Sequence, residues 1–267
     1  MAAGISSTSR SDLARLTGRG QRFIVVADAE RELGLDREGA RRRLVRWAEQ
    51  GWLRRVRRDL YIPVPVDAEH PESWGADPVV LADEVWGPCY VSGWTAANHW
   101  GLSEQSFRTT VIRTTRRVRQ STQRLLDNEF LLAHVAPENM TWGLRREWRD
   151  ERRIQFADPA RTLVDMLDDP ALGGGVRLVT ECLGAYLESE DVGALISAAD
   201  RLGNRAVFKR LGYLAEQIGA EEHILDASEA RLSQGFALLD PTQSTGGSRS
   251  RRWRIVANVQ VDATEPS

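Results

Sequence analysis

Apolar residues recur at helical spacing in three short stretches near the start of the chain. We expect helices over residues 11–16, 27–33 and 37–50. Gly34 is placed to end the second of these helices, and Asp36 is a suitable N-cap for the third. Two helices joined by a three-residue turn that contains glycine are typical of a helix-turn-helix.

The third expected helix has two chemically different faces. At a helical spacing of about 100° per residue, Ala40, Leu44 and Trp47 fall on one face, which must pack inward. Arg42 and Arg46 fall almost opposite, and arginine can bind guanine in the major groove through two hydrogen bonds. The candidate DNA contacts on this helix are Arg37, Glu38, Arg41, Arg42, Arg43 and Arg46.

A basic hairpin is expected to follow this helix. Gly51 stops the helix, apolar residues alternate over 53–62, and Arg58 and Asp59 stand where the hairpin must turn. Four cations on or near the hairpin would reach phosphates or a minor groove: Arg54, Arg55, Arg57 and Arg58. Residues 1–63 are therefore predicted to form a winged helix-turn-helix DNA-binding domain.

The rest of the chain has a mixed pattern. Residues 64–78 are rich in proline and acid and are predicted to be a linker. Residues 79–267 are predicted to form a larger domain in which strands precede and follow a block of helices. Helices are expected within 79–85, 90–102, 158–167, 180–187, 192–202 and 204–218; strands at 109–115, 130–135 and 253–261; a charged hairpin or loop at 142–154; a flexible loop at 244–250. The predicted fold class is α+β.

Charge is distributed unevenly along the 267 residues. Residues 1–62 hold 14 arginines and 8 acidic residues, a net charge of +6, whereas the remainder holds 22 basic and 30 acidic residues, a net charge of −8. A basic segment on an acidic body favours a local polyanion-binding module. No apolar run is long enough for a membrane span, so we expect no membrane partner and a cytoplasmic, nucleoid-associated protein.

The sequence offers little support for catalysis. Its single lysine, Lys209, is not in a phosphate-binding loop, and its histidines and two cysteines lack ligand spacing. We therefore expect no catalytic residues, no metal and no cofactor. Ser92, His99 and Asp165 could converge in space, although nothing local supports such a triad.

The chain resembles the AbiEi-type antitoxins of bacterial type IV toxin–antitoxin (abortive-infection) systems. The resemblance rests on five segments in the same order along nearly the whole chain: 51–61 (GWLRRVRRDLY), 92–102 (SGWTAANHWGL), 158–165 (DPARTLVD), 210–214 (RLGYL) and 253–259 (WRIVANV). One departure is Asp59, which stands where the family usually has glycine. This departure disfavours a positive φ at the hairpin turn.

The resemblance implies a repressor that binds inverted repeats in its own promoter. It also implies a body that assists cooperative DNA binding and counteracts a nucleotidyltransferase-like toxin encoded beside it, without requiring a stable complex. Two alternatives stay open. The body could be an enzyme that covalently modifies the toxin, or the arginine helix could bind an acidic protein instead of DNA.

Overall fold

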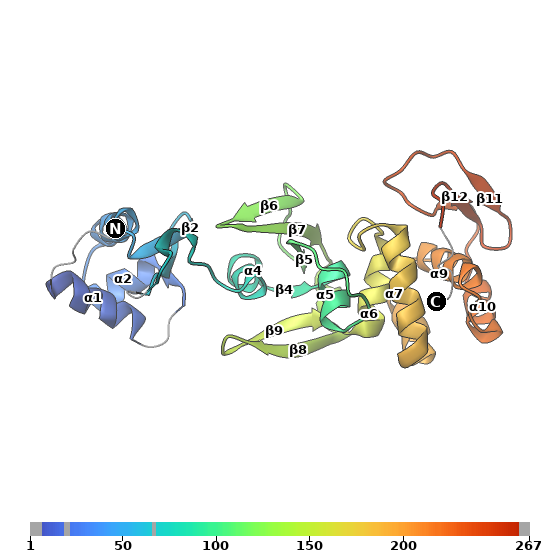
Figure 1. Ribbon diagram of the computed structural model, residues 1–267, viewed down its shortest axis with the longest axis horizontal. Coiled ribbons are helices and arrows are strands. Elements are labelled where there is room, and N and C mark those ends of the chain that lie inside the picture. The colour runs from blue at the N-terminus through green and yellow to red at the C-terminus, as the bar shows by residue number, and fades with distance from the viewer. Residues whose placement is uncertain (1–6, 19–21, 66–67, 262–267) are drawn as a thin grey trace. The chain divides into compact units, whose positions relative to one another are not determined.

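The computed structural model describes residues 7–18, 22–65 and 68–261 (Figure 1). The chain divides into two compact units. Unit 1 comprises residues 1–78 together with 124–129, and unit 2 comprises 79–123 together with 130–267.

Unit 1 is built from helices and a small antiparallel sheet. Its elements are α1 (Ser7–Thr17), β1 (Ile24–Val25), α2 (Val26–Leu33), α3 (Arg37–Glu49), β2 (Leu53–Arg57), β3 (Leu60–Pro63) and the 3-10 turn η1 (Pro71–Ser73). The strand order is β1-β3-β2, and Tyr61 of β3 pairs with Ile24 on one side and Arg55 on the other. Leu16, Leu44 and other apolar side chains of the helices and strands form a hydrophobic core.

The turn between α2 and α3 has the expected chemistry. Gly34 ends α2 in the left-handed region, with φ of 65°, a conformation that costs glycine little. Asp36 caps α3 by accepting a hydrogen bond from the Gly39 amide at 2.9 Å. These two residues set the boundaries of the helix pair.

Unit 2 is a mixed sheet with helices. Its first elements, with residues 124–129 of β6 and β7 counted in unit 1, are α4 (Pro78–Trp86), β4 (Cys89–Val91), α5 (Gly93–His99), β5 (Thr109–Thr114), β6 (Thr122–Leu125), β7 (Asn128–His134), the 3-10 turn η2 (Pro137–Met140), β8 (Leu144–Arg149) and β9 (Arg152–Ala157). The strand order is β6-β7-β5-β4-β9-β8, with β4 antiparallel to β5 and parallel to β9.

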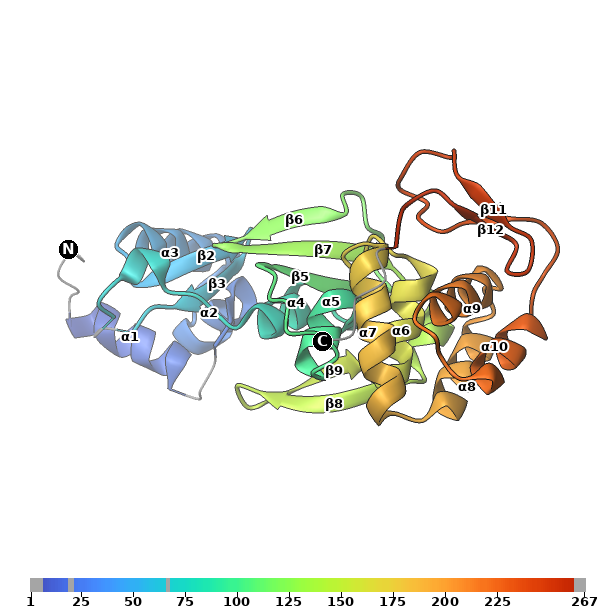
Figure 2. The ribbon, with the colours of Figure 1, turned by 45° about the vertical axis from the view of Figure 1, so that its right-hand side comes forward.

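A helical block follows the large sheet (Figure 2). It consists of α6 (Pro159–Asp168), α7 (Val176–Ser189), α8 (Val192–Leu202), α9 (Ala206–Gln217) and α10 (Glu222–Glu229). Helix α6 is central, since it packs against α5, α7, α8 and α9. A small third sheet, in the order β10-β12-β11, contains β10 (Ala237–Leu238), β11 (Ser248–Ser250) and β12 (Ile255–Ala257). Helices and sheets together give the mixed α+β class that the sequence predicts.

Three expectations for unit 2 need correction. The stretch 90–102 begins with strand residues of β4 before α5 starts, and the expected strand over 253–261 is limited to β12. The Trp253 ring is fully buried against α9 instead of alternating along a strand. The end of the expected loop at 244–250 forms β11 and pairs with β12. Within the described part of the chain, no helix combines the length and apolarity that crossing a bilayer requires.

Candidate nucleic-acid interface

Helix α3 has one buried and one exposed face, as its sequence pattern predicts. Ala40, Leu44 and Trp47 are at most 1% exposed and belong to the core of unit 1. Arg46 is exposed on the opposite side, and the Arg42 side chain is 69% exposed. Arg42 makes an ion pair of 2.6 Å with Glu38, one turn earlier. Such a solvent-exposed pair is worth little, so the guanidinium can exchange this partner for another anion.

Two other arginines of α3 are held by internal contacts. The Arg41 guanidinium binds the Asp59 carboxylate through two hydrogen bonds, of 2.9 and 2.5 Å. This contact holds the pKa of Asp59 below its usual value and raises the pKa of Arg41. Arg43 binds Asp12 of α1 at 2.8 Å and lies over the Trp47 ring. The geometry therefore removes Arg43 from the exposed face and gives Arg41 a structural partner.

The basic hairpin β2–β3 turns where the sequence places its turn. The expectation that Asp59 would avoid a positive φ is wrong, since its φ is 62°. Aspartate tolerates the left-handed region better than most residues, and the Arg41 fork fixes its carboxylate there. The pairing register also shifts between Arg55 and Arg57, as in a β-bulge.

The four candidate cations of the hairpin differ in their freedom. Arg54 is engaged by the Asp127 carboxylate at 3.1 Å and by the Trp74 carbonyl. Arg55 makes only a long hydrogen bond, of 3.4 Å, to the carbonyl of Arg57. In α3 and the hairpin, four arginines are exposed and have guanidinium groups that make no hydrogen bond or ion pair with the described residues: Arg37, Arg46, Arg57 and Arg58.

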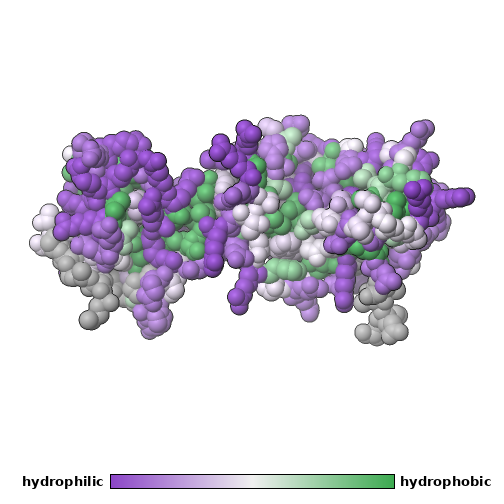
Figure 3. Space-filling model, turned by 90° about the horizontal axis from the view of Figure 1, so that it is seen from above, coloured by the Kyte–Doolittle hydropathy of each residue, from purple (hydrophilic) through white to green (hydrophobic). Residues whose placement is uncertain are grey.

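Two shallow grooves bring the helix and the hairpin cations together. A groove of about 600 Å³ runs along the exposed face of α3, between Arg37 and Glu49, and includes the partly exposed Val45. A second, of about 490 Å³, is lined by Arg37, Arg57 and Arg58. Because Arg37 lines both, the two basic surfaces are continuous. Figure 3 shows that the visible surface of unit 1 is predominantly hydrophilic.

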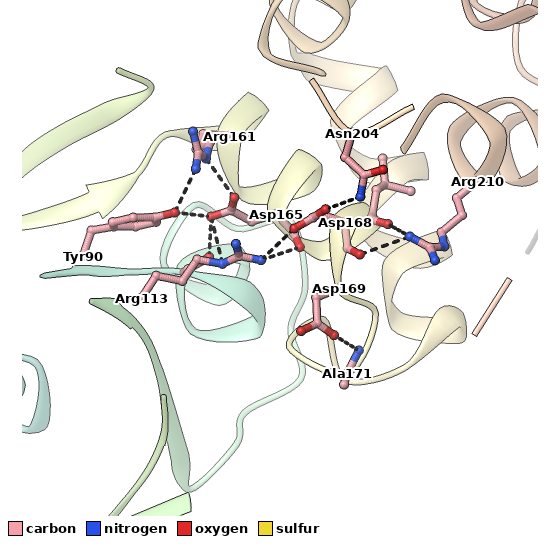
Figure 4. Close-up of polar contacts among 11 residues, drawn as sticks. Tyr90, Arg113, Arg161, Asp165, Asp168, Asp169, Ala171, Asn204 and Arg210 are labelled. Atoms are coloured by element: carbon pink, nitrogen blue, oxygen red, sulfur yellow. Dashed lines mark hydrogen bonds and ion pairs between the residues drawn. The ribbon is translucent and has the colours of Figure 1, made fainter. Parts of the chain in front are cut away.

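A buried polar cluster in unit 2 is centred on Asp165 of α6 (Figure 4). The Asp165 carboxylate accepts hydrogen bonds from Arg161 at 2.8 Å, Tyr90 at 2.9 Å and Ser92 at 2.7 Å. Arg113 lies 3.6 Å from the same carboxylate. Burial and the nearby Asp165 charge raise the pKa of Tyr90 well above its ordinary value.

The cluster does not form the triad that Ser92, His99 and Asp165 could make. Ser92 and Asp165 meet, but the His99 ring contacts Phe156 and lies 3.0 Å from an Arg149 nitrogen. Ser92, Arg161 and Asp165 have no exposed surface, and the cluster ties α6 to the sheet. Sequence reasoning overlooked this network, although Arg161 and Asp165 stand one helical turn apart in the 158–165 segment.

Other residues of the five segments also have internal roles. A Cβ at Gly212 of α9 would lie 2.0 Å from the Trp253 ring, so the 210–214 and 253–259 segments pack directly on one another. Arg210 donates hydrogen bonds to the carbonyls of Leu167 and Asp168 at the end of α6. These residues hold unit 2 together.

The described residues offer no candidate metal site, and the two cysteines are buried. The described residues contain no cluster of histidine, cysteine and carboxylate side chains that could hold a metal ion. Cys89 and Cys182 are buried and unpaired, and burial raises the pKa of each thiol to about 12. Neither cysteine is a reactive thiolate near neutral pH.

Comparisons with known proteins bear on the fold. No family model matches the chain, and no curated protein matches its sequence. The chain is similar in structure to the RV2827C protein from Mycobacterium tuberculosis, with a TM-score of 0.65 and 16% sequence identity. The similarity covers 95% of this chain and 92% of that one. At this identity it establishes a shared fold alone.

Proposed function

We propose that unit 1 is a winged helix-turn-helix that binds double-stranded DNA. In this proposal α2 and α3 form the helix-turn-helix, α3 enters the major groove, and the β2–β3 hairpin is the wing. The observation that carries it is the exposed arginine face of α3, directly opposite the buried Leu44 and Trp47. The capped turn between the helices and the basic hairpin that follows support the same assignment.

The contacts divide by position. Arg42 and Arg46 of α3 are assigned to base edges, where each bidentate guanine contact contributes about 1–3 kcal/mol of discrimination. Val45 lines the same groove and offers an apolar contact of the kind that suits a thymine methyl group. Arg57 and Arg58 of the hairpin are assigned to phosphates, which fix the orientation of a protein on the duplex.

We further propose that the protein is a cytoplasmic, nucleoid-associated repressor and antitoxin of a type IV system. It would bind inverted repeats upstream of its own operon and counteract a nucleotidyltransferase-like toxin encoded there. This part of the proposal rests on the five sequence segments that resemble AbiEi-type antitoxins. Because several of those segments have packing roles, the toxin-directed activity requires a test of its own.

The DNA-binding proposal is tested by mobility shift of the full chain on duplex DNA from its own upstream region. Arg42→Ala and Arg46→Ala should weaken binding to the specific duplex far more than binding to a scrambled duplex. Arg57→Ala should weaken both and reduce the log–log salt slope by about 0.9, the contribution of one phosphate. Arg177→Ala, which removes an exposed arginine of α7, is the matched control.

Equal losses from Arg42, Arg46 and Arg57 variants on both duplexes would refute the division into base and phosphate contacts. Binding of no duplex by the wild type would refute the DNA-binding proposal itself. The antitoxin proposal is tested by co-expression with the product of the adjacent gene. Failure of the intact protein to relieve growth inhibition by that product would refute it.

A further inference from the structure

Strand β8 lies at one edge of the large sheet of unit 2 and carries an exposed aromatic and basic surface. It pairs antiparallel with β9 and forms the outermost position of the strand order. Trp148 faces Arg153 across the two strands, and Arg146 faces Gln155. Since every second residue of a strand points to the same side, the register places these four side chains on one face of the hairpin.

Trp148 is the most exposed large hydrophobic side chain in the described part of the chain, at 63%. The Arg153 guanidinium lies over its ring, 4.8 Å from the ring centroid. This contact leaves much of the indole surface in water. An exposed ring beside a cation is a platform on which another flat group can stack.

Two arginines beside this ring are not held by a carboxylate in the described residues. Arg146 and Arg153 are exposed, and neither has an ion pair within the described residues. Arg145, on the other side of the same strand, lies over the Trp100 ring and also lacks an ion pair there. A strand edge this rich in arginine opposes pairing with a second copy of itself, because the like charges would meet. The surface is suited to a polyanion.

We propose that the Arg146–Trp148–Arg153 surface binds single-stranded nucleic acid. An unpaired base would stack on the Trp148 indole, and the flanking phosphates would bind the guanidinium groups of Arg146 and Arg153. Stacking requires a base whose flat face is accessible, which a duplex does not present along its length. This proposal does not depend on the duplex site proposed on unit 1.

The test uses fluorescence anisotropy of the full chain with fluorescein-labelled dT20 and rU20. Wild type should bind, and Trp148→Ala should weaken binding about tenfold, within the usual range for one stacked base. Trp148→Phe should retain most of the affinity, because it keeps a ring on which a base can stack. Arg146→Ala and Arg153→Ala should each weaken binding and reduce the log–log salt slope by about 0.7.

Two controls match these variants. Phe236→Ala removes another exposed ring of unit 2, which also lies beside an arginine, and Arg177→Ala removes an exposed cation. Both should bind the oligonucleotides as the wild type does. Arg46→Ala should also leave this binding unchanged, and Trp148→Ala should leave duplex binding unchanged, so failure of one site is distinguishable from failure of the other.

The proposal is overturned if the wild type binds neither oligonucleotide, or if Trp148→Ala binds as tightly as the wild type. It is also overturned if Trp148→Ala weakens duplex and single-strand binding equally, which would indicate a general polyanion surface. A change of sedimentation coefficient on Trp148→Ala, with unchanged oligonucleotide binding, would assign the strand edge to a second copy of the chain.

Discussion

Replacement of Asp165 by alanine should severely destabilise unit 2. The substitution removes the acceptor shared by Tyr90, Ser92 and Arg161 and leaves the buried guanidinium groups of Arg161 and Arg113 without this carboxylate. Arg161 is fully buried, and one of its terminal nitrogens already lacks a hydrogen-bond partner. Loss of one member of a buried ion pair costs about 3–5 kcal/mol, so we expect a loss in that range.

Urea unfolding of the full chain, followed by tryptophan fluorescence and circular dichroism, measures this loss. The matched control is Asp226→Ala, which removes an exposed carboxylate from α10 and should change the free energy of unfolding by less than about 0.5 kcal/mol. The double variant Arg161→Leu/Asp165→Leu should be more stable than Asp165→Ala, because it removes the charge together with its partner.

A cost below about 1 kcal/mol for Asp165→Ala, the ordinary net value of a single hydrogen bond, would contradict this prediction. A double variant less stable than Asp165→Ala would contradict it as well. Either result would mean that the Asp165 carboxylate is not what compensates the buried arginine charges.

Three further experiments have defined outcomes. Gly212→Ala should lower the free energy of unfolding in urea by about 1–3 kcal/mol, because its Cβ would lie 2.0 Å from the Trp253 ring. A loss below about 0.5 kcal/mol, the size of an ordinary surface change, would show that the ring moves aside. The arginine contact that lowers the pKa of Asp59 stabilises the folded state above the ordinary carboxyl pKa, about 4, and this contribution is lost as pH falls through the lower folded pKa. The Tm advantage of wild type over Asp59→Asn should therefore shrink between pH 5 and pH 2 (roughly the carboxyl range), and an advantage independent of pH would contradict the pairing. Burial raises the thiol pKa of Cys89 and Cys182 to about 12, so iodoacetamide at neutral pH should label neither until urea is added; rapid labelling of the folded protein would refute their burial.

The sequence predicts local features of unit 1 well because they depend on neighbouring residues. The cap at Asp36, the stop at Gly34 and the two faces of α3 follow from spacing and side-chain chemistry within one or two turns. The ion-pair partners of the arginines do not follow from such local spacing. Arg43 reaches Asp12, 31 positions away, and Arg54 reaches Asp127, 73 positions away, so only the folded chain shows which cations are engaged.

The same limit applies to unit 2. Periodicity predicts the helices of the block because each buries a continuous stripe, as α9 does with Phe208 and Leu211. It does not predict β4, because the three residues of this strand are all buried and show no alternation of apolar and polar positions. The Asp165 cluster joins α6 to β4 and β5, and no local pattern predicts a contact between residues so far apart.

The fork between Arg41 and Asp59 joins the middle of α3 to the tip of the hairpin. Two elements that follow one another in the chain are thereby clamped at a set angle and spacing. A ligand that touches both would meet a surface already arranged and would lose little entropy in ordering it. Severing the fork would leave every outward cation in place while loosening their mutual geometry, so affinity could fall without the loss of a single intermolecular contact.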